Sequence, residues 1–246
     1  MTSPILATQD LTVRFGGHVA VDAVSCAFHA GELTAIVGPN GAGKSTLFAL
    51  LTRLYAVQHG EMSICGHSIR QHPTEVMQQL GVVFQQSTLD LDLTVGQNLK
   101  YHASLHGISG RDAQQRMETE LQRMEMADRI NDKVRSLNGG HRRRVEIARA
   151  LMHNPSVLLL DEPTVGLDPQ TRLKLNQHVR SLCENQDLTV LWATHLIEEV
   201  RDEDNVLMLF KGELKAQGQG AAICASHQHD NLTHLFHHLS GVEEVA

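Results

Sequence analysis

The fold is decided by one stretch of the chain, Gly38-Pro39-Asn40-Gly41-Ala42-Gly43-Lys44-Ser45. It fits the pattern G-x-x-x-x-G-K-[S/T], in which glycines let successive backbone N–H groups point at phosphate oxygens. An apolar strand segment, Leu33–Val37, precedes it, and leucines at helical spacing follow it. A plain glycine-rich turn is the alternative, but the strand–loop–helix context favours a phosphate-binding loop. The pattern predicts that Lys44 reaches the β- and γ-phosphates of a nucleotide and that the Ser45 hydroxyl ligates Mg²⁺.

Strand and helix patterns extend in both directions from this loop. Two early segments, Ile5–Phe15 and His18–Phe28, alternate apolar and polar residues and predict half-buried strands joined by a Gly-Gly turn. The segment from Ser45 to Tyr55 is expected to be a helix. Further strands are predicted at residues 81–84, 157–160 and 188–193, a helix at 169–185, and a hairpin at 206–215 that turns at Lys211-Gly212.

The middle of the chain differs in character. Strong helix formers dominate from Thr94 to Ala150, above all in 111–126 and 142–152. We therefore expect an α/β fold: a P-loop NTPase (RecA-like) core with an N-terminal antiparallel β subdomain and an α-helical subdomain inserted at about residues 87–152. Residues 1–217 would form this nucleotide-binding domain, and residues 218–246 a loose C-terminal tail with one short helix near Leu232–Leu239.

Composition excludes several other classes of protein. The 246 residues are 41% hydrophobic and 20% charged, as in an ordinary globular protein that can bury a core. A net charge of −7 argues against nucleic acid as the main partner, and the arginines at 142–144 are expected to be a solvated helix face. The four cysteines form no C-x-x-C pair, which favours reduced thiols of a cytosolic protein. We see no signal peptide and no apolar run approaching the ~20 residues that span a bilayer.

A second acidic motif follows the strand at 157–160. This strand ends in Asp161, and Glu162 comes next. Asp161 suits the outer coordination shell of Mg²⁺, and Glu162 suits a general base for an attacking water. Taken alone, an Asp-Glu pair after a strand is more often a helix cap, but its combination with the phosphate loop favours catalysis.

Between these motifs lies Leu137-Asn138-Gly139-Gly140-His141, followed by a helical run at 142–151. This sequence resembles the LSGGQ signature of ATP-binding-cassette (ABC) proteins. The order of motifs is also similar to that family over nearly all of residues 5–215: phosphate loop, glutamine loop, signature, acidic strand, D-loop and switch histidine. Nucleotide kinases and GTPases lack the signature. The resemblance implies a transport-coupled ATPase that converts ATP and water to ADP and phosphate.

The resemblance assigns roles to matching residues. Gln85 would sense Mg²⁺ and the water, and would start the segment that meets a membrane partner. Asp168 would lie in the D-loop that crosses to an opposing subunit. His195 would hold the γ-phosphate and the catalytic water, although a lone histidine at a strand end is more often structural. Phe15 would stack on adenine, with plain core packing as the alternative.

The family's functional residues therefore map onto three sets in this chain. The implied catalytic residues are Lys44, Gln85, Glu162 and His195. The implied Mg²⁺ ligands are Ser45, Gln85 and Asp161. The implied ATP contacts are Phe15, Gly38, Pro39, Asn40, Gly41, Ala42, Gly43, Lys44, Ser45, Thr46, Asn138, Gly139, Gly140 and Asp168.

Two residues depart from the family's signature. Its serine is Asn138 here, and its glutamine is His141. In the family, the serine hydroxyl donates to the γ-phosphate of ATP held by the opposite subunit. An asparagine amide also donates, but it is larger and planar. We expect a competent site and leave its rate open.

The resemblance also implies partners. Two copies would pair around ATP, and a membrane-spanning permease on a separate chain would hold the protein at the cytoplasmic face of the inner membrane as a peripheral subunit; no nucleic acid is expected. Residues 89–99 and 231–241 are similar to exporter-type, ABC-2-like cassettes. More narrowly, the LNGGH signature and its helix are similar to cassettes that accompany pyrroloquinoline-quinone-dependent alcohol oxidation.

Two other functions stay open. One is a cassette ATPase of an assembly or repair system without transport, although the coiled coils and zinc modules of repair types are missing from the sequence. The other is a regulatory module with a dead site, which the intact Lys44, Asp161, Glu162 and His195 oppose. The tail histidines are either a metal site or, as we prefer, ordinary surface residues: His227, His229, His234, His237 and His238.

Overall fold

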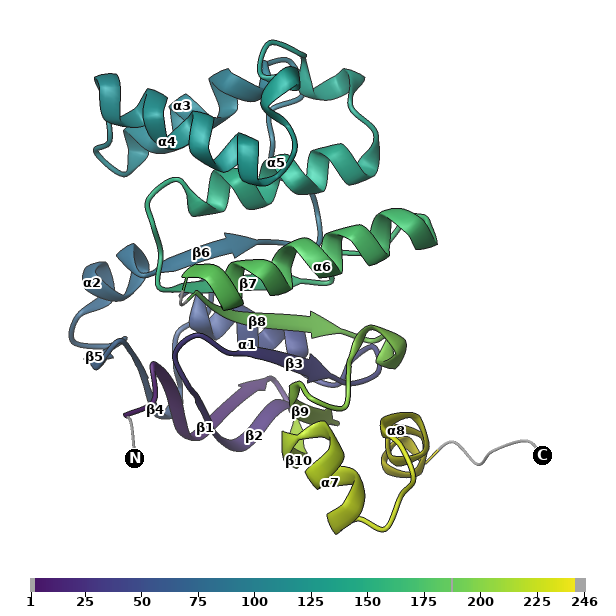
Figure 1. Ribbon diagram of the computed structural model, residues 1–246. Coiled ribbons are helices and arrows are strands. Elements are labelled where there is room, and N and C mark those ends of the chain that lie inside the picture. The colour runs from purple at the N-terminus through teal and green to yellow at the C-terminus, as the bar shows by residue number, and fades with distance from the viewer. Residues whose placement is uncertain (1–2, 187, 242–246) are drawn as a thin grey trace.

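The strands form two sheets in the computed structural model, which describes residues 3–186 and 188–241 (Figure 1). The antiparallel sheet has the order β2-β1-β4-β5, and the larger sheet has the order β10-β9-β3-β8-β7-β6. In the larger sheet, neighbours from β9 to β6 run parallel, and β10 runs antiparallel to β9. The strands are β1 (Leu6–Phe15), β2 (His18–Phe28), β3 (Leu33–Val37), β4 (His59–Ile64), β5 (His67–Ser68), β6 (Leu80–Val83), β7 (Val157–Asp161), β8 (Thr189–Thr194), β9 (Asn205–Phe210) and β10 (Glu213–Gln219). This arrangement confirms the predicted α/β class.

The helices cover the larger sheet and extend beyond its edge (Figure 1). They are α1 (Lys44–Leu51), α2 (Pro73–Gln78), α3 (Val95–Leu105), α4 (Gly110–Arg123), α5 (Gly139–Leu151), α6 (Pro169–Gln186), α7 (Gly220–Ser226) and α8 (Leu232–Ser240). Short 3-10 turns lie at Ala127–Arg129, Val134–Ser136 and Ile197–Glu199. The prediction placed the end of α1 at Tyr55, four residues too far. The chain leaves the helix at Thr52, and Arg53 takes a left-handed conformation with φ 57°, a common way to end a helix.

Helix α1 connects the two sheets. Its buried side chains Leu47, Phe48 and Leu51 share one apolar core with Leu11 of β1 and Leu191 of β8. An eight-residue helix is too short to be stable alone, so this packing, rather than propensity, fixes it. The phosphate loop at its N-terminus is therefore held between the sheets.

Helices α3, α4 and α5 form a layer whose core is continuous with β6, β7, β8 and α6 (Figure 1). Thr94 and Gln97 form a capping box at the start of α3: the Thr94 Oγ1 accepts from Gln97 N at 3.1 Å, and Gln97 Oε1 accepts from Thr94 N at 2.8 Å. Leu99, Met117 and Val145, one from each helix, are completely or almost completely buried in this core. The layer thus packs as a unit, as expected of a helical subdomain.

The C-terminal segment is better ordered than its sequence suggested. The short helix predicted near Leu232–Leu239 is confirmed as α8, whereas the stretch predicted to be loose holds a second helix, α7. Both helices pack against the β9–β10 hairpin. Ile223 and Leu235 are buried there beside Phe210. The predicted domain boundary at 217/218 stays a prediction, and β10 runs through it to Gln219.

If α8 is part of the folded core, Leu235→Ala should lower the free energy of unfolding by about 2–5 kcal/mol, because it removes a fully buried side chain. The matched control is Leu173→Ala on α6, whose side chain is 58% exposed and which should change stability by less than about 0.5 kcal/mol. Urea unfolding followed by circular dichroism measures both. Equal midpoints for the two variants would show that α8 is not packed.

Candidate functional site

The predicted motifs meet at the carboxyl ends of four adjacent parallel strands. β3 leads into the phosphate loop, β7 ends in Asp161, β8 precedes His195 and β6 precedes Gln85. The register aligns these ends, with Val37 opposite Thr194 and Asp161 opposite Ala193. Ligands of open α/β sheets bind at this edge. The strand order therefore brings together residues that lie more than a hundred positions apart.

The phosphate loop is supported from outside by the tip of the β9–β10 hairpin. Gly212 N donates to Ala42 O at 3.0 Å, and Asp22 N donates to Gly212 O at 2.8 Å. Gly43 has φ 105°, and a Cβ at this position would lie 2.6 Å from Ala20 O. Only glycine satisfies both the left-handed backbone and this close approach. The loop is therefore fixed by contacts from β2 and from the hairpin.

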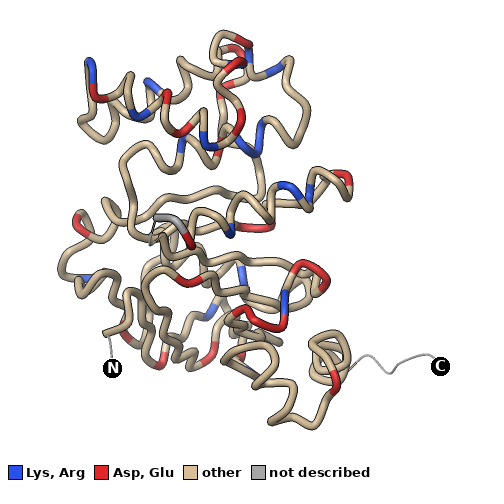
Figure 2. The backbone as a smooth tube through the Cα atoms, in the orientation of Figure 1, with Lys and Arg blue, Asp and Glu red and all other residues tan. Residues whose placement is uncertain are grey.

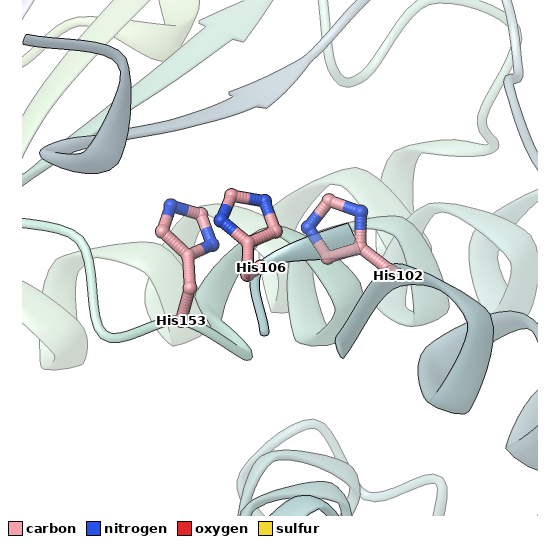
Figure 3. Close-up of side chains that lie close together, drawn as sticks. All are labelled: His102, His106 and His153. Atoms are coloured by element: carbon pink, nitrogen blue, oxygen red, sulfur yellow. The ribbon is translucent and has the colours of Figure 1, made fainter. Parts of the chain in front are cut away.

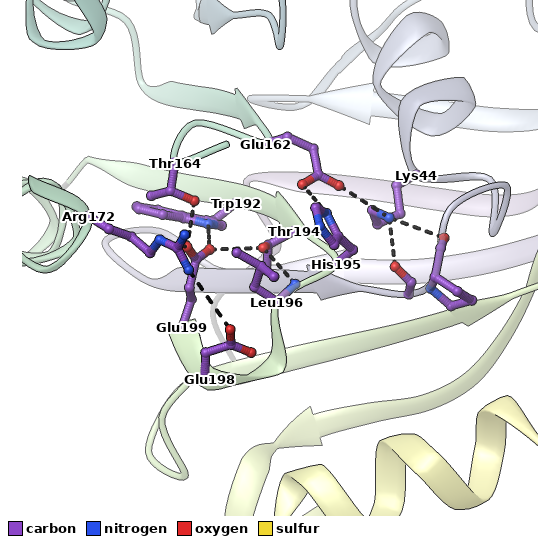
Figure 4. Close-up of polar contacts among 12 residues, drawn as sticks. Lys44, Glu162, Thr164, Arg172, Trp192, Thr194, His195, Leu196, Glu198 and Glu199 are labelled. Atoms are coloured by element: carbon purple, nitrogen blue, oxygen red, sulfur yellow. Dashed lines mark hydrogen bonds and ion pairs between the residues drawn. The ribbon is translucent and has the colours of Figure 1, made fainter. Parts of the chain in front are cut away.

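A buried carboxylate lies between two nitrogen-bearing side chains at the loop (Figure 4). Glu162 Oε1 is 3.4 Å from Lys44 Nζ, and Glu162 Oε2 is 2.5 Å from His195 Nδ1. Lys44 Nζ also donates to Gly38 O at 2.7 Å. Burial lowers the pKa of Lys44 below its usual value, and the charge of Glu162 partly opposes this shift. Glu162 has a left-handed backbone with φ 49°, which is strained for glutamate and typical of functional positions.

Asp161 is the candidate metal ligand beside this group. Its carboxylate is 6% exposed, and its Oδ1 has no hydrogen-bond partner among the residues that the structure describes. Burial raises the pKa of Asp161, with a further contribution from the charge of Glu162, while Lys44 and a hydrogen bond from Ser45 oppose the rise. A buried carboxylate oxygen without a partner is costly, so a ligand at this point would relieve it.

A cavity of about 290 Å³ opens in front of the loop. Many of the predicted residues line it: Phe15, Asn40, Gly41, Ala42, Gly43, Lys44, Ser45, Thr46, Gln85 and Glu162. Phe15 is 44% exposed and meets the ring of Tyr55 edge to face, with centroids 5.0 Å apart. Core packing therefore does not account for Phe15. His18 also lines the cavity, although nothing in its sequence context pointed to it.

Glu199 is a functional candidate that the sequence did not reveal. Its buried carboxylate accepts hydrogen bonds from Thr194 Oγ1 at 2.8 Å and from Trp192 Nε1 at 3.3 Å. On its other oxygen it accepts from Thr164 Oγ1 at 2.5 Å (Figure 4). Thr194 precedes His195, and Thr164 follows Glu162 by two residues. Glu199 therefore links the segment that carries Glu162 to the segment that carries His195.

The expectation that the arginines at 142–144 form a solvated helix face is wrong for two of them, since Arg143 and Arg144 are buried. Arg143 donates to the backbone oxygens of Phe84 at 2.7 Å and Gln85 at 3.0 Å, and to Glu146 Oε2 at 2.8 Å. The signature helix α5 thereby holds the backbone of the glutamine loop. The sequence did not reveal this contact, because the two backbone oxygens that Arg143 binds lie 58 and 59 residues earlier in the chain.

The signature residues lie outside the cavity. Asn138, Gly139, Gly140 and Asp168 are absent from its lining. Asn138 instead caps α5, where its Oδ1 accepts from His141 N at 2.8 Å. Asp168 holds the start of α6, where its carboxylate accepts from Thr171 N at 3.0 Å and from Thr171 Oγ1 at 2.6 Å; these hydrogen bonds lower its pKa. One chain therefore does not bring the signature and the phosphate loop together.

Comparison with known proteins agrees with this geometry. The family model described as ABC transporter matches residues 21–165. The linearmycin resistance ATP-binding protein LnrL of Bacillus subtilis is 32% identical over 98% of this chain and 77% of its own length. The Nod factor export ATP-binding protein I of Ralstonia nicotianae is 35% identical over 95% of this chain and 70% of its own.

Solved structures show the same fold. The structure of cbiO1 from Clostridium perfringens, part of the ABC transporter complex cbiONQ, has a TM-score of 0.83 at 26% identity and covers 97% of this chain and 99% of that one. A dimeric ATP-binding cassette in a post-hydrolysis state with ADP and Pi has a TM-score of 0.76 at 30% identity, covering 87% and 98%. No helix in the described ranges is long and apolar enough to cross a membrane. With its phosphate loop, acidic strand and signature in this arrangement, the chain belongs to the ABC transporter family as an ATP-binding, ATP-hydrolysing subunit.

Proposed function

We propose that this chain is the motor subunit of an exporter, and that Glu162 is the general base of ATP hydrolysis. The observation that supports this most is the position of the Glu162 carboxylate between Lys44 and His195 at the mouth of the phosphate loop. When ATP binds, Lys44 lies at the β- and γ-phosphates. Glu162 takes the proton of the attacking water while the water oxygen bonds to the γ-phosphorus and the bond to ADP breaks. His195, hydrogen-bonded to Glu162, orients this base.

The residues near the loop fit a magnesium ion. Mg²⁺ prefers oxygen ligands and usually keeps several of its waters. Ser45 and Gln85 line the cavity and would supply oxygen ligands directly. The buried Asp161 Oδ1, which has no partner among the described residues, would accept a hydrogen bond from a water of the outer coordination shell. The ion would neutralise phosphate charge.

A second copy of the chain completes the site in this proposal. Asn138, Gly139 and Gly140 lie outside the cavity of their own chain, so they contact ATP only if a second copy presents them head to tail. The related cassette solved with ADP and Pi is dimeric. Because the Asn138 Oδ1 is used in the helix cap, its Nδ2 amide is left to donate to the γ-phosphate. Asp168 would contact the nucleotide from the same opposing chain.

A permease on another chain would dock on the helical layer. Three large apolar side chains are exposed there: Leu91 at 44%, Tyr101 at 65% and Leu105 at 67%. The segment that carries them begins near Gln85, so the docking surface is linked to the site. Figure 2 shows basic and acidic positions interspersed along this layer, which suits a protein partner better than nucleic acid.

The relatives support the exporter part of the proposal. Linearmycin resistance and Nod factor export are what the names of two relatives state of those proteins, and both fit an exporter-type cassette at the cytoplasmic face of the inner membrane. A role beside pyrroloquinoline-quinone-dependent alcohol oxidation stays a prediction from the signature and its helix alone.

The proposed chemistry predicts that nucleotide binding and hydrolysis respond differently to two substitutions. Lys44→Ala should lower both nucleotide affinity and hydrolysis, because it removes the cation at the phosphates. Glu162→Gln should keep nucleotide binding and slow hydrolysis by about 10²–10⁴-fold, since it keeps the shape and removes the base. Steady-state phosphate release and binding of a fluorescent ATP analogue separate the two. A Glu162→Gln variant with wild-type turnover would exclude Glu162 as the base.

Substitutions of Asn138 distinguish its role as the cap of α5 from the proposed hydrogen bond of its amide to ATP. Asn138→Ala should slow hydrolysis by roughly 10- to 100-fold, since a hydrogen bond to a charged group contributes about 1.5–3 kcal/mol. Asn138→Ser keeps a cap and a donor and should stay within a few fold of wild type. Asn138→Asp keeps the cap but places a carboxylate at the phosphate, so it should be at least as slow as Asn138→Ala. If Asn138→Asp retains activity while Asn138→Ala does not, only the cap matters, and no contact across the dimer exists.

Membrane association tests the transport role. In its native cells the chain should sediment with membranes. Leu105→Asp should reduce this fraction, because it places a charge on the exposed apolar face of α3. Leu173→Asp, on the exposed side of α6, is the control and should sediment as wild type does. Finding the native protein wholly in the supernatant would favour a cassette ATPase of an assembly system.

A further inference from the structure

Three histidines meet at the junction of the helical layer and the larger sheet (Figure 3). His102 lies on α3, His106 directly follows the end of this helix, and His153 follows the end of α5. One ring nitrogen from each lies within 4.8 Å of the other two. Among the described residues, this is the one group of three or more histidine, cysteine or acidic side chains with ligand atoms so close. The tail histidines named in the sequence analysis do not form such a group.

The hydrogen bonds around this triad leave two buried ring nitrogens without a partner among the described residues. His153 Nε2 lies 2.9 Å from Leu80 O, a pure acceptor, so this nitrogen carries the proton and Nδ1 is the lone-pair atom. That Nδ1 is buried without a partner among the described residues, and so is His102 Nε2. Backbone carbonyls orient metal-binding histidines in the same way. The exposed His106 ring stacks on His153 with centroids 3.9 Å apart and turns easily because it faces solvent.

We propose that His102, His106 and His153 bind a divalent transition-metal ion such as Zn²⁺, with a water in the fourth position. Imidazole is a preferred ligand of late first-row metals, and three protein ligands with one open position are a common zinc arrangement. Tetrahedral zinc places its nitrogens about 3.4 Å apart, so binding draws the rings together by rotation of the exposed His106. Packing alone does not explain the triad, because stacked rings leave two buried ring nitrogens without a hydrogen-bond partner among the described residues.

The electrostatics of the triad select the class of ion. Burial lowers the pKa of His102 to about 3 and that of His153 to about 4, so both are neutral ligands at physiological pH. Arg149 and Arg116 face these rings and reduce the affinity for any cation, although Arg149 is engaged with Thr88 O at 2.8 Å and Arg116 with Met152 O at 3.2 Å. The triad contains no carboxylate, which disfavours Mg²⁺ and Ca²⁺. The ion is thus distinct from the magnesium proposed at Asp161.

A bound ion would join two parts of the molecule. His102 and His106 belong to the helical layer, whereas His153 is tied to Leu80 of β6 in the larger sheet. Occupancy would fix α3 to this strand and resist relative movement of the layer and the sheet. The structure therefore predicts that the metal stabilises the folded chain as well as binding to it.

The test is calorimetric titration of the chelator-treated full chain with Zn²⁺ alone. Wild type should bind one ion at a defined site, and Zn²⁺ should raise its Tm by several degrees. His106→Ala removes an exposed ligand without disturbing the core and should weaken this site by at least about tenfold, since losing even a residue that only supports a ligand costs about 10–100-fold. His153→Gln should do the same.

The matched control is the double variant His234→Ala/His238→Ala, which removes a pair at the same helical spacing on α8. It should keep the wild-type affinity and the rise in Tm. The proposal is overturned if wild type binds no Zn²⁺, if His106→Ala binds as tightly as wild type, or if the α8 variant loses the site. The proposal is established if both triad variants lose affinity for Zn²⁺ and the rise in Tm, and the α8 variant keeps both.

Discussion

A single buried carboxylate sets the requirements that the rest of the structure meets. Glu162 carries its charge in a nearly inaccessible position, and such a charge is stable only when partners surround it. Lys44 at the start of α1 and His195 directly after β8 supply those partners. For all three to meet, β3, β8 and β7 must be neighbours, and the loop before α1 must lie at their common edge. The strand order and the position of α1 between the sheets both follow from this constraint.

The parts that sequence reasoning predicted are those encoded by short patterns. The phosphate loop, the acidic end of β7 and the signature each occupy a few consecutive residues, and the parallel strands around them are continuous apolar runs. Their meeting at one sheet edge followed from the fold class. Glu199 and Arg143 escaped prediction because their partners are distant in sequence: Arg143 binds a backbone 58 residues earlier, and Glu199 reaches Thr164 across 35. No local pattern identifies such pairs. The β4–β5 strands and α7 were missed because they are short and weakly periodic.

Helix α5 begins at the signature. The Asn138 Oδ1 caps this helix, so the proposed donation to ATP falls to the Nδ2 of the same side chain. Arg143 of the same helix holds the backbone of Gln85. Helix α5 therefore determines both the position of the signature and that of the glutamine loop, so a movement of the helical layer shifts the two together.

The contact between the hairpin tip and the phosphate loop has a consequence for how this protein tolerates change in length. Hairpin tips are usually where chains accept inserted residues, tags or whole domains. Here the Gly212 backbone is hydrogen-bonded to Ala42 and Asp22, and a Cβ at Gly212 would lie 2.9 Å from Ala20 O. An insertion between Lys211 and Gly212 would displace the backbone that supports the loop. The length of this turn is therefore constrained by the phosphate loop that it supports.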